Sequence, residues 1–349
     1  MAKSKDEISR KQSGRFARTL ALAVGGVVAA ILMVGTGTYF ATKIYYENLL
    51  ALAHPIFVPS SPYKLLHPII GISLPGDQFG NGFPDVRSEI QSSVSALPAG
   101  TVTRYAVYLR DLNSGKWEGI NENDLYDPAS MLKVVVAIAA YRQAEQQPEF
   151  LSTPLTYTPA LAQINAQLAF ALPSDLQVGQ SYTVPALVEK ELTDSDNGAV
   201  YTLLNSINQQ VLDAVYGDLS IPSPSATSSV GYKISPREYS RFFRILYNGT
   251  LSLNWADSEQ ILEDLSQSTY TEGLAAGIPS GITVAHKYGE HVDGSNNVVN
   301  DVELSDCGIV YYTPRPYFLC AMTEGKNPTA LDAVIAQISK LVYQKISAD

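Results

Sequence analysis

The order of strand-like and helix-like segments constrains the fold of this chain more than any other feature. Two strand patterns, at 103–112 and 117–121, precede a long helix-rich stretch, and three more follow it near 282–290, 305–312 and 317–323. Runs rich in β-branched and aromatic residues, bounded by Gly, Pro, Asn or Ser, are typical of strands. Because strands need partners, the runs from both ends must meet in one sheet, with the helices inserted between them. This order predicts an α+β fold.

Helical patterns fill the middle of this region, and some of them carry capping signals. An apolar helix is expected at 130–146, and "SYTVPALVEKELTDSDNGAVYTLLNSI" reads as helix, loop and helix. Another helix has Ser235 as its N-cap, Pro236 at its first position and Gly249 just past its end. Further helices are expected at 83–97, 253–268 and 327–344, and residues 150–180 read as irregular or partly helical.

A charge-free run of 24 residues, Thr19 to Thr42, precedes the folded region. At about 1.5 Å per residue, a helix of this length crosses the roughly 30 Å hydrocarbon core of a bilayer. Residues 1–18 carry a net charge of +4, which favours a cytoplasmic N-terminus. A cleaved signal peptide is the alternative, but the run is long for one and no clear cleavage site follows it. We therefore expect a single-pass protein of the cell membrane. Residues 1–18 would be a cytoplasmic basic tail and residues 19–42 the anchor in the lipid bilayer. Residues 43–79 would be a stalk that begins to dock onto the folded domain near residue 62, and residues 80–349 would be an extracytoplasmic domain.

The charge of the chain limits the classes of partner. The net charge is −10, and the part that follows residue 18 carries −14. A strongly acidic domain repels a phosphate backbone, so a nucleic-acid partner is excluded. No cofactor is predicted, and the sequence indicates no particular oligomeric state.

The two cysteines lie in one predicted hairpin. Cys307 and Cys320 flank a Pro-rich turn in "SDCGIVYYTPRPYFLCAMT", and their midpoint falls between Thr313 and Pro314. The two side chains can therefore face each other across the hairpin. An exported domain could oxidise such a pair to a disulfide, and two buried thiols are the alternative.

The segment "YDPASMLKVVVAIAAYRQAE", residues 126–145, places Ser130 and Lys133 on one face at the start of an apolar helix. A serine hydroxyl is a weak nucleophile that needs a base. A lysine whose pKa is lowered by burial can be that base. The spacing alone is common, and Ser61 and Lys64 repeat it in the stalk. An ordinary N-cap serine and a solvated lysine are the alternative, but the run after Lys133 is strongly apolar.

Two further elements follow in order. Ser195-Asp196-Asn197 lies in the loop before an apolar helix, where a hydroxyl could relay a proton and an amide could hold a substrate or the lysine. Lys287-Tyr288-Gly289 lies in "ITVAHKYGE", which we expect to form an edge strand that lines a cleft. Taken singly, the first reads as ordinary loop composition and the second as a surface lysine on a strand.

Together the three elements resemble the Ser-x-x-Lys, Ser-Asp-Asn and Lys-Thr-Gly motifs of the serine β-lactamases and penicillin-binding proteins. "YTEGLAAGIPSGITVAHKYGE" is similar to the helix, turn and strand that carry the family's third motif. The resemblance covers about residues 80–345 and is closest to class A β-lactamases. It implies a five-stranded antiparallel sheet with flanking helices, an all-α lobe and a cleft between the two.

The resemblance also implies roles for the matching residues. Ser130 would be the acylated nucleophile, and Lys133 would help to deprotonate it. Ser195 would pass a proton to the leaving nitrogen, and Asn197 would orient the substrate and Lys133. Lys287 would bind the substrate carboxylate and polarise Ser195.

The oxyanion would be bound by two backbone amides, that of Ser130 and one just after Gly289, from Glu290 or His291. The substrate would be a β-lactam or a D-alanyl cell-wall peptide, since both reactions pass through an acyl-serine.

Three departures from the family pattern bear on activity. Residues 198–234 contain no glutamate, only Asp213 and Asp218, which both should end a helix. The residue that activates the deacylating water in class A enzymes is therefore missing. Tyr288 replaces the usual threonine or serine of the third motif. No arginine lies in the strands that flank Lys287, and Arg315 lies in the hairpin turn, at the wrong end for a carboxylate.

Other kinds of site are poorly supported by the sequence. His286 and His291 lack a third ligand, so no metal site is predicted. A Ser-His-Asp triad is disfavoured because His54 and His67, two of the four histidines, belong to the stalk. The main alternative is a membrane-tethered binding or scaffold domain that kept the penicillin-binding shape and lost turnover. The missing glutamate and Tyr288 motivate that alternative, and the presence of all four residues needed for acylation argues against it.

Overall fold

The computed structural model describes residues 36, 38–39, 43, 54–57, 62–67, 69–73, 83, 85–166, 174–224, 231–250, 253–295 and 298–348. The chain divides into two compact units, one of Met1–Ala53 with Ser73–Phe79 and one of His54–Ile72 with Gly80–Asp349. The second unit holds the folded domain. Apart from Thr36, Thr38 and Tyr39, the predicted anchor lies outside the described residues. Among the residues that are described, no helix has the length and apolarity needed to cross a membrane.

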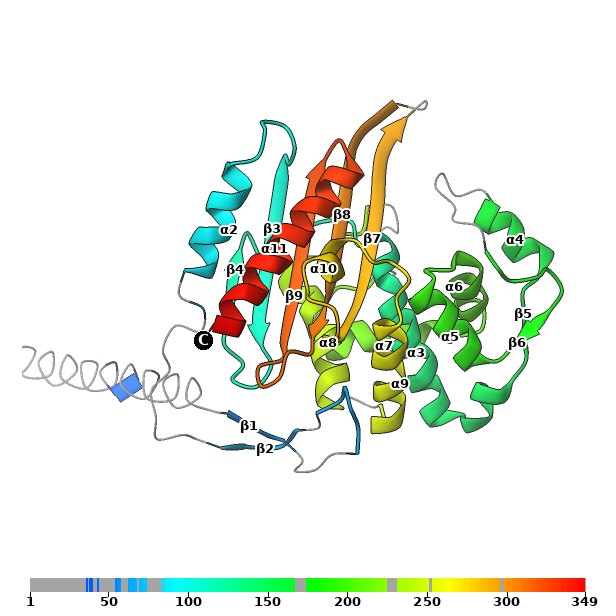
Figure 1. Cartoon of the computed structure of the whole chain (residues 1–349). Helices are drawn as coiled ribbons and strands as arrows, with labels where there is room; N and C mark the ends of the chain where they lie inside the picture. Colours follow the sequence, from blue (N-terminus) through cyan, green and yellow to red (C-terminus); the bar gives the residue numbers. More distant parts are fainter. Residues whose placement is uncertain are drawn as a thin grey trace, which may run out of the picture. The chain divides into compact units, whose positions relative to one another are not determined.

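A five-stranded antiparallel sheet forms the centre of the domain (Figure 1). Its strands, in spatial order, are β4 (Trp117–Ile120), β3 (Arg104–Asp111), β9 (Tyr317–Gly325), β8 (Val298–Val310) and β7 (Val284–Ser295). β3 and β4 come from the start of the domain, and the other three strands come from its end. The predicted α+β fold, with one sheet built from both ends, is therefore confirmed.

The hairpin of β7 and β8 is longer than the sequence predicts. β8 begins at Val298 rather than near residue 305, and β7 continues to Ser295, with a register shift between Asp293 and Gly294. Residues 291–304 hold three Asn, one Gly and three acidic residues between their valines, so their composition indicates a loop. Backbone hydrogen bonds between neighbouring strands need no apolar pattern, and they extend the ladder past the buried part.

The two faces of the sheet bury different side chains, as the period of two residues along a strand requires. Val107, Leu109 and Leu319 pack against α2 (Val86–Ser95) and α11 (Pro328–Ala348). Tyr108, Phe318 and Met322 lie in the other core cluster, on the face covered by α8 (Pro236–Asn248). The sheet is thus the middle layer of a three-layer domain.

The helix-rich middle of the chain forms a lobe around α3 (Lys133–Gln146), which is buried over most of its length. An apolar helix buried on nearly all sides belongs at the centre of such a lobe. One 3₁₀ turn, η1 (Ala129–Leu132), leads into α3. The remaining elements of this part are η2 (Pro148–Ser152), β5 (Leu155–Thr156), α4 (Pro159–Ala166), β6 (Ser181–Tyr182), α5 (Val184–Thr193), α6 (Asn197–Leu204), α7 (Gln209–Asp218) and α9 (Trp255–Ser266). The short helix α10 (Gly273–Ala276) instead packs against α11 on the other face of the sheet.

The capping signals of α8 act as the sequence predicts. The Ser235 side chain accepts from the Glu238 amide, and the Glu238 carboxylate accepts from the Ser235 amide, which completes a capping box. Gly249 ends the helix with a φ of 57°, a conformation that glycine adopts at no steric cost.

A segment that precedes the sheet packs against α8 and α9. The backbone amides of Lys64, Leu65 and Leu66 donate to the Glu259 carboxylate of α9 at 2.6–3.1 Å. His67 stacks on Tyr247 of α8, with ring centroids 5.1 Å apart. A separate two-stranded sheet is formed by β1 (His54–Phe57) and β2 (Ile69–Ser73).

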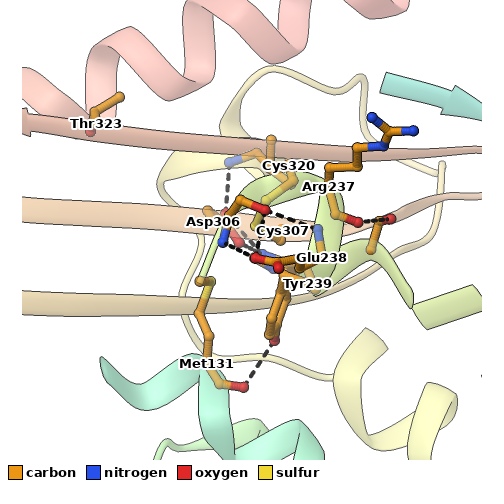
Figure 2. The surroundings of a disulfide bond; sticks show 12 residues. Met131, Arg237, Glu238, Tyr239, Asp306, Cys307, Cys320 and Thr323 are labelled. Carbon is orange, nitrogen blue, oxygen red and sulfur yellow. Dashed lines mark hydrogen bonds and ion pairs between the residues drawn. A yellow bond between two sulfur atoms is a disulfide. The ribbon is translucent and has the colours of Figure 1, made fainter. Parts of the chain in front are cut away.

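Cys307 and Cys320 are opposite residues of β8 and β9, so the predicted facing arrangement is confirmed. Their sulfur atoms are bonded in a disulfide that is buried under α8. Figure 2 shows the disulfide with Tyr239 of α8, whose hydroxyl donates to the Met131 carbonyl at 2.9 Å. This bond ties α8 to the turn that carries Ser130.

Candidate active site

The structure brings the three predicted elements together from distant parts of the chain. Ser130 lies in η1 and Lys133 is the first residue of α3. Ser195 lies in the loop between α5 and α6, and Asn197 begins α6. Lys287 lies on β7, which is an edge strand as predicted. One expectation needs correction, because Ser130 lies in a 3₁₀ turn rather than in the helix itself.

Backbone strain beside the reactive groups explains that difference. Ala129 has a φ of 44° and Ser195 has a φ of 56°, both in the left-handed region that disfavours side chains with a Cβ. The Ala129 conformation, held by a hydrogen bond from its amide to Asp127 Oδ1 at 2.8 Å, turns the chain before α3 begins. Strained residues of this kind persist only where the surrounding structure holds them, and they cluster at functional sites.

The Lys133 ammonium is the centre of the hydrogen-bond cluster. Its Nζ donates to Ser130 Oγ at 2.9 Å, to Ser195 Oγ at 3.0 Å and to Asn197 Oδ1 at 2.8 Å. The Ser195 carbonyl oxygen is a fourth acceptor, at 2.7 Å, so the three N–H groups of the ammonium are shared among four acceptors. One amine therefore links the first two sequence elements.

Lys287 approaches the same hydroxyl from the sheet. Its Nζ donates to Ser195 Oγ at 3.0 Å, so Ser195 lies between the two lysines. No carboxylate of the described residues hydrogen-bonds to either ammonium. Two cations thus share a small polar cluster without a directly paired anion.

Burial lowers the pKa of both lysines and so disfavours their charged forms. Lys133 is 4% exposed, and burial lowers its pKa to about 8, against the opposing effects of Glu191 and Asp196. Lys287 is 1% exposed, and burial together with the charge of Lys133 lowers its pKa well below the ordinary value. Desolvation disfavours a charged amine, so a neutral amine is readily available beside the Ser130 hydroxyl.

The Ser195 loop is positioned by its neighbour Asp196. The Asp196 carboxylate caps α6 by accepting from the Ala199 amide at 2.9 Å. It also accepts from Ser174 Oγ at 2.8 Å and from the Asp175 amide at 2.9 Å. The three bonds fix the conformation of the loop, in which the side chains of Ser195 and Asn197 both hydrogen-bond with Lys133.

Gly289 lets β7 approach the turn that carries Ser130. A Cβ at position 289 would lie 2.3 Å from the Pro128 carbonyl oxygen and 3.2 Å from the Met131 amide nitrogen. Only glycine permits this contact. The close approach brings the backbone after Gly289 near the backbone of Ser130, as an oxyanion site made of two amides requires. The side chain of Glu290, the residue that follows Gly289, is exposed.

Sequence reasoning missed Tyr270, which stacks on Tyr288 with ring centroids 3.9 Å apart and planes 16° apart. The Tyr270 hydroxyl donates to Asp332 of α11. Burial raises the pKa of Tyr288, and a side-chain hydrogen bond with Ser195 acts in the opposite direction. The stack is invisible in sequence because the rings lie 18 residues apart, across a helix and a turn.

Sequence reasoning also missed Glu191 of α5, which is 0% exposed and whose two carboxylate oxygens have no hydrogen-bond partner among the described residues. Burial raises its pKa well above the ordinary value, against the opposing effects of Lys133 and Lys287. A glutamate in the middle of the predicted helix gave no sequence signal of such burial.

The remaining predicted residues have structural partners. His286 Nδ1 lies 2.9 Å from Asp306 Oδ1, and His291 Nδ1 lies 3.5 Å from Asp127 Oδ2. Arg315 is ion-paired with Asp111 at 3.2 Å, at the end of β3. Asp218 ends α7 as expected and pairs with Arg142 at 2.6 Å. Asp213 lies within α7 instead of ending a helix, because the helix continues to Asp218.

Comparisons with known proteins agree with this geometry. The model of the Beta-lactamase enzyme family matches residues 85–346. A beta-lactamase of Streptomyces albus G is 25% identical over 288 residues, which cover 76% of this chain and 87% of that protein.

Two solved structures share the fold. A class A beta-lactamase from Mycobacterium abscessus has a TM-score of 0.61 and 20% identity, over 75% of this chain and 99% of that one. A mutant of PBP-A, solved as an acyl-enzyme complex with penicillin G, has a TM-score of 0.61 and 21% identity, over 76% of this chain and 97% of that one.

Proposed function

Because the chain belongs to the Beta-lactamase enzyme family and is a serine hydrolase of that family, we propose that it forms an acyl-enzyme at Ser130 with β-lactams or related D-alanyl peptides. The observation that carries this proposal is the position of Lys133 Nζ, 2.9 Å from Ser130 Oγ and 3.0 Å from Ser195 Oγ. A buried amine with a lowered pKa at this position can act as the base that serine needs.

The acylation step follows from these positions. The neutral Lys133 amine takes the hydroxyl proton while Ser130 Oγ attacks the carbonyl carbon of the substrate amide. The backbone amides of Ser130 and Glu290 stabilise the negative oxygen of the tetrahedral intermediate. Ser195, held between Lys133 and Lys287, gives its proton to the leaving nitrogen as the carbon–nitrogen bond breaks. It regains a proton from Lys133, which holds the one taken from Ser130 and lies 3.0 Å from Ser195 Oγ. Asn197 keeps Lys133 in position through its 2.8 Å hydrogen bond.

Deacylation should be slow in this protein. Hydrolysis of the ester needs a base that activates a water molecule, and residues 198–234 contain no glutamate. A mutant of PBP-A, which has the same fold, was solved as an acyl-enzyme complex with penicillin G. The proposal is therefore a penicillin-reactive enzyme whose acyl-enzyme is long-lived, because deacylation is slower than acylation.

Intact mass spectrometry of the full chain in detergent micelles, mixed with benzylpenicillin and sampled over time, tests this function. We expect a long-lived adduct of one penicillin that maps to Ser130 and disappears in Ser130→Ala. Ser61→Ala is the matched control, because Ser61 and Lys64 repeat the spacing of Ser130 and Lys133. Unchanged labelling of Ser130→Ala would refute the assignment of the nucleophile. A folded wild-type chain that is never labelled would favour the non-catalytic binding domain.

The same proposal includes an anchor at 19–42 with the enzyme domain outside the membrane. The charge-free run and the net charge of +4 that precedes it support this topology. The full chain should remain in the membrane fraction after alkaline extraction, and a chain lacking residues 1–42 should not. Release of the full chain by alkali would count against the anchor.

A further inference from the structure

Tyr288 lies beside the lysine that is expected to bind a substrate carboxylate. Its ring centroid is 4.5 Å from Lys287 Nζ. Its ring also stacks on Tyr270, which is itself fixed by the hydroxyl bond to Asp332, and its hydroxyl has a hydrogen bond with Ser195. The ring is therefore held between an ammonium and a second aromatic ring, and it is not a loosely placed surface group.

The π face of Tyr288 occupies a position near Lys287 that an anion would otherwise take. Lys287 Nζ donates only to Ser195 Oγ at 3.0 Å and to the Tyr288 carbonyl at 3.4 Å among the described residues. A cation over a tyrosine ring within about 6 Å is attracted by the ring quadrupole. A carboxylate that approached Lys287 would have to displace the ring and disrupt both aromatic contacts.

The charges around Tyr288 also disfavour an incoming carboxylate. Burial raises the pKa of the Tyr288 hydroxyl, and the nearby carboxylates of Glu290, Asp306 and Asp332 raise it further. β7, β8 and β9 contain no arginine that could supply a second cation. A new negative charge at the ring would therefore be repelled by these carboxylates, and the lysines near it, Lys287 and Lys133, are both deeply buried and have lowered pKa values.

We propose that Tyr288 is a specificity-determining residue that fills the carboxylate position, so that the enzyme selects acyl substrates whose group next to the scissile amide is uncharged. This inference rests on the proposed function. An ester or amide group can lie against the ring without displacing it and needs no cationic partner. A substrate with a free carboxylate at that place is acylated more slowly.

Benzylpenicillin and its methyl ester form a matched pair of probes, because they differ only in the charge of this group. The measured quantity is the ratio of the two acylation rate constants, ester over acid, from time-resolved intact mass of the full chain in detergent. Each rate constant is divided by that of the same compound with hydroxide, which removes differences in intrinsic reactivity.

The wild-type chain should prefer the ester. Tyr288→Thr, which opens Lys287 to the carboxylate, should lower the ester-over-acid ratio roughly 10- to 100-fold, the range of one hydrogen bond to a charged group. Tyr288→Phe keeps the ring and is the matched control. It loses the hydroxyl that hydrogen-bonds with Ser195, which changes the rates of both compounds alike, so its ratio should remain that of the wild type. Tyr270→Leu removes the stacking partner and should shift the ratio in the same direction as Tyr288→Thr, which keeps the test available if one variant does not fold.

The outcomes separate this inference from the function on which it rests. A wild-type preference for the acid, or equal ratios in the wild type and the folded threonine and leucine variants, would overturn the role of Tyr288 and leave acylation at Ser130 standing. If no form of the protein is labelled by either compound, the acyl-enzyme function fails and this inference fails with it.

Discussion

Raising the pH from 7 to 9 should increase the acylation rate of Ser130 about tenfold, and the rate should then level off, because the proposed base, Lys133, has a pKa lowered to about 8. Burial under the helical lobe is the main cause of that lowered pKa. The amine accepts a proton only when it is neutral, so activity is lost as the pH falls below the pKa of Lys133.

The magnitude follows from the neutral fraction of the amine. With a pKa of about 8, roughly 9% of Lys133 is neutral at pH 7 and roughly 91% at pH 9. With the ordinary value of 10.5, the fraction is roughly 0.03% at pH 7 and roughly 3% at pH 9. A pKa of about 8 therefore predicts a tenfold rise of the acylation rate between pH 7 and 9 that ends in a plateau. The ordinary pKa predicts a hundredfold rise without a plateau.

Single-turnover acylation by a chromogenic β-lactam, measured by stopped flow between pH 6 and 9.5, distinguishes these cases. Lys133→Met is the matched variant, since methionine has a similar length and no amine. It should lose the pH-dependent rise and roughly 10²- to 10⁴-fold in rate, the usual contribution of a general base. A hundredfold rise without a plateau in the wild type, or an unchanged profile in Lys133→Met, would refute the role of the buried amine.

Two further predictions concern the framework of the site. Glu259→Ala removes the acceptor of the Lys64, Leu65 and Leu66 amides, so the free energy of unfolding in urea should fall by about 2–4 kcal/mol; a midpoint equal to that of the wild type would contradict it. Gly289→Ala places a Cβ 2.3 Å from the Pro128 carbonyl oxygen, so β7 must move away from η1. The free energy of unfolding should fall by about 1–3 kcal/mol, and the acylation rate should fall as well. A wild-type acylation rate in the alanine variant would show that the close approach is not needed.

The parts of the fold that depend on local pattern could be predicted from the sequence. The caps of α8 at Ser235 and Gly249 and the edge position of the Lys287 strand were all confirmed. Strand ends were less predictable, as the early start of β8 at Val298 shows, because ladder hydrogen bonds extend through polar residues. Ser130 was expected in a helix and lies in a 3₁₀ turn, because the left-handed conformation of Ala129 depends on a hydrogen bond to Asp127.

The sequence by itself determined the identity and order of the candidate reactive groups, since Ser130, Lys133, Ser195 and Lys287 were identified from three ordered elements that together resemble the motifs of one family. Only the tertiary structure decided their chemistry. Lys133 and Lys287 have lowered pKa values because elements more than 60 residues away exclude water from them. Tyr288 covers Lys287 because α10 and the turn that follows it bring Tyr270 against its ring. Periodicity and capping are properties of neighbouring residues, whereas desolvation and stacking depend on which distant surfaces meet.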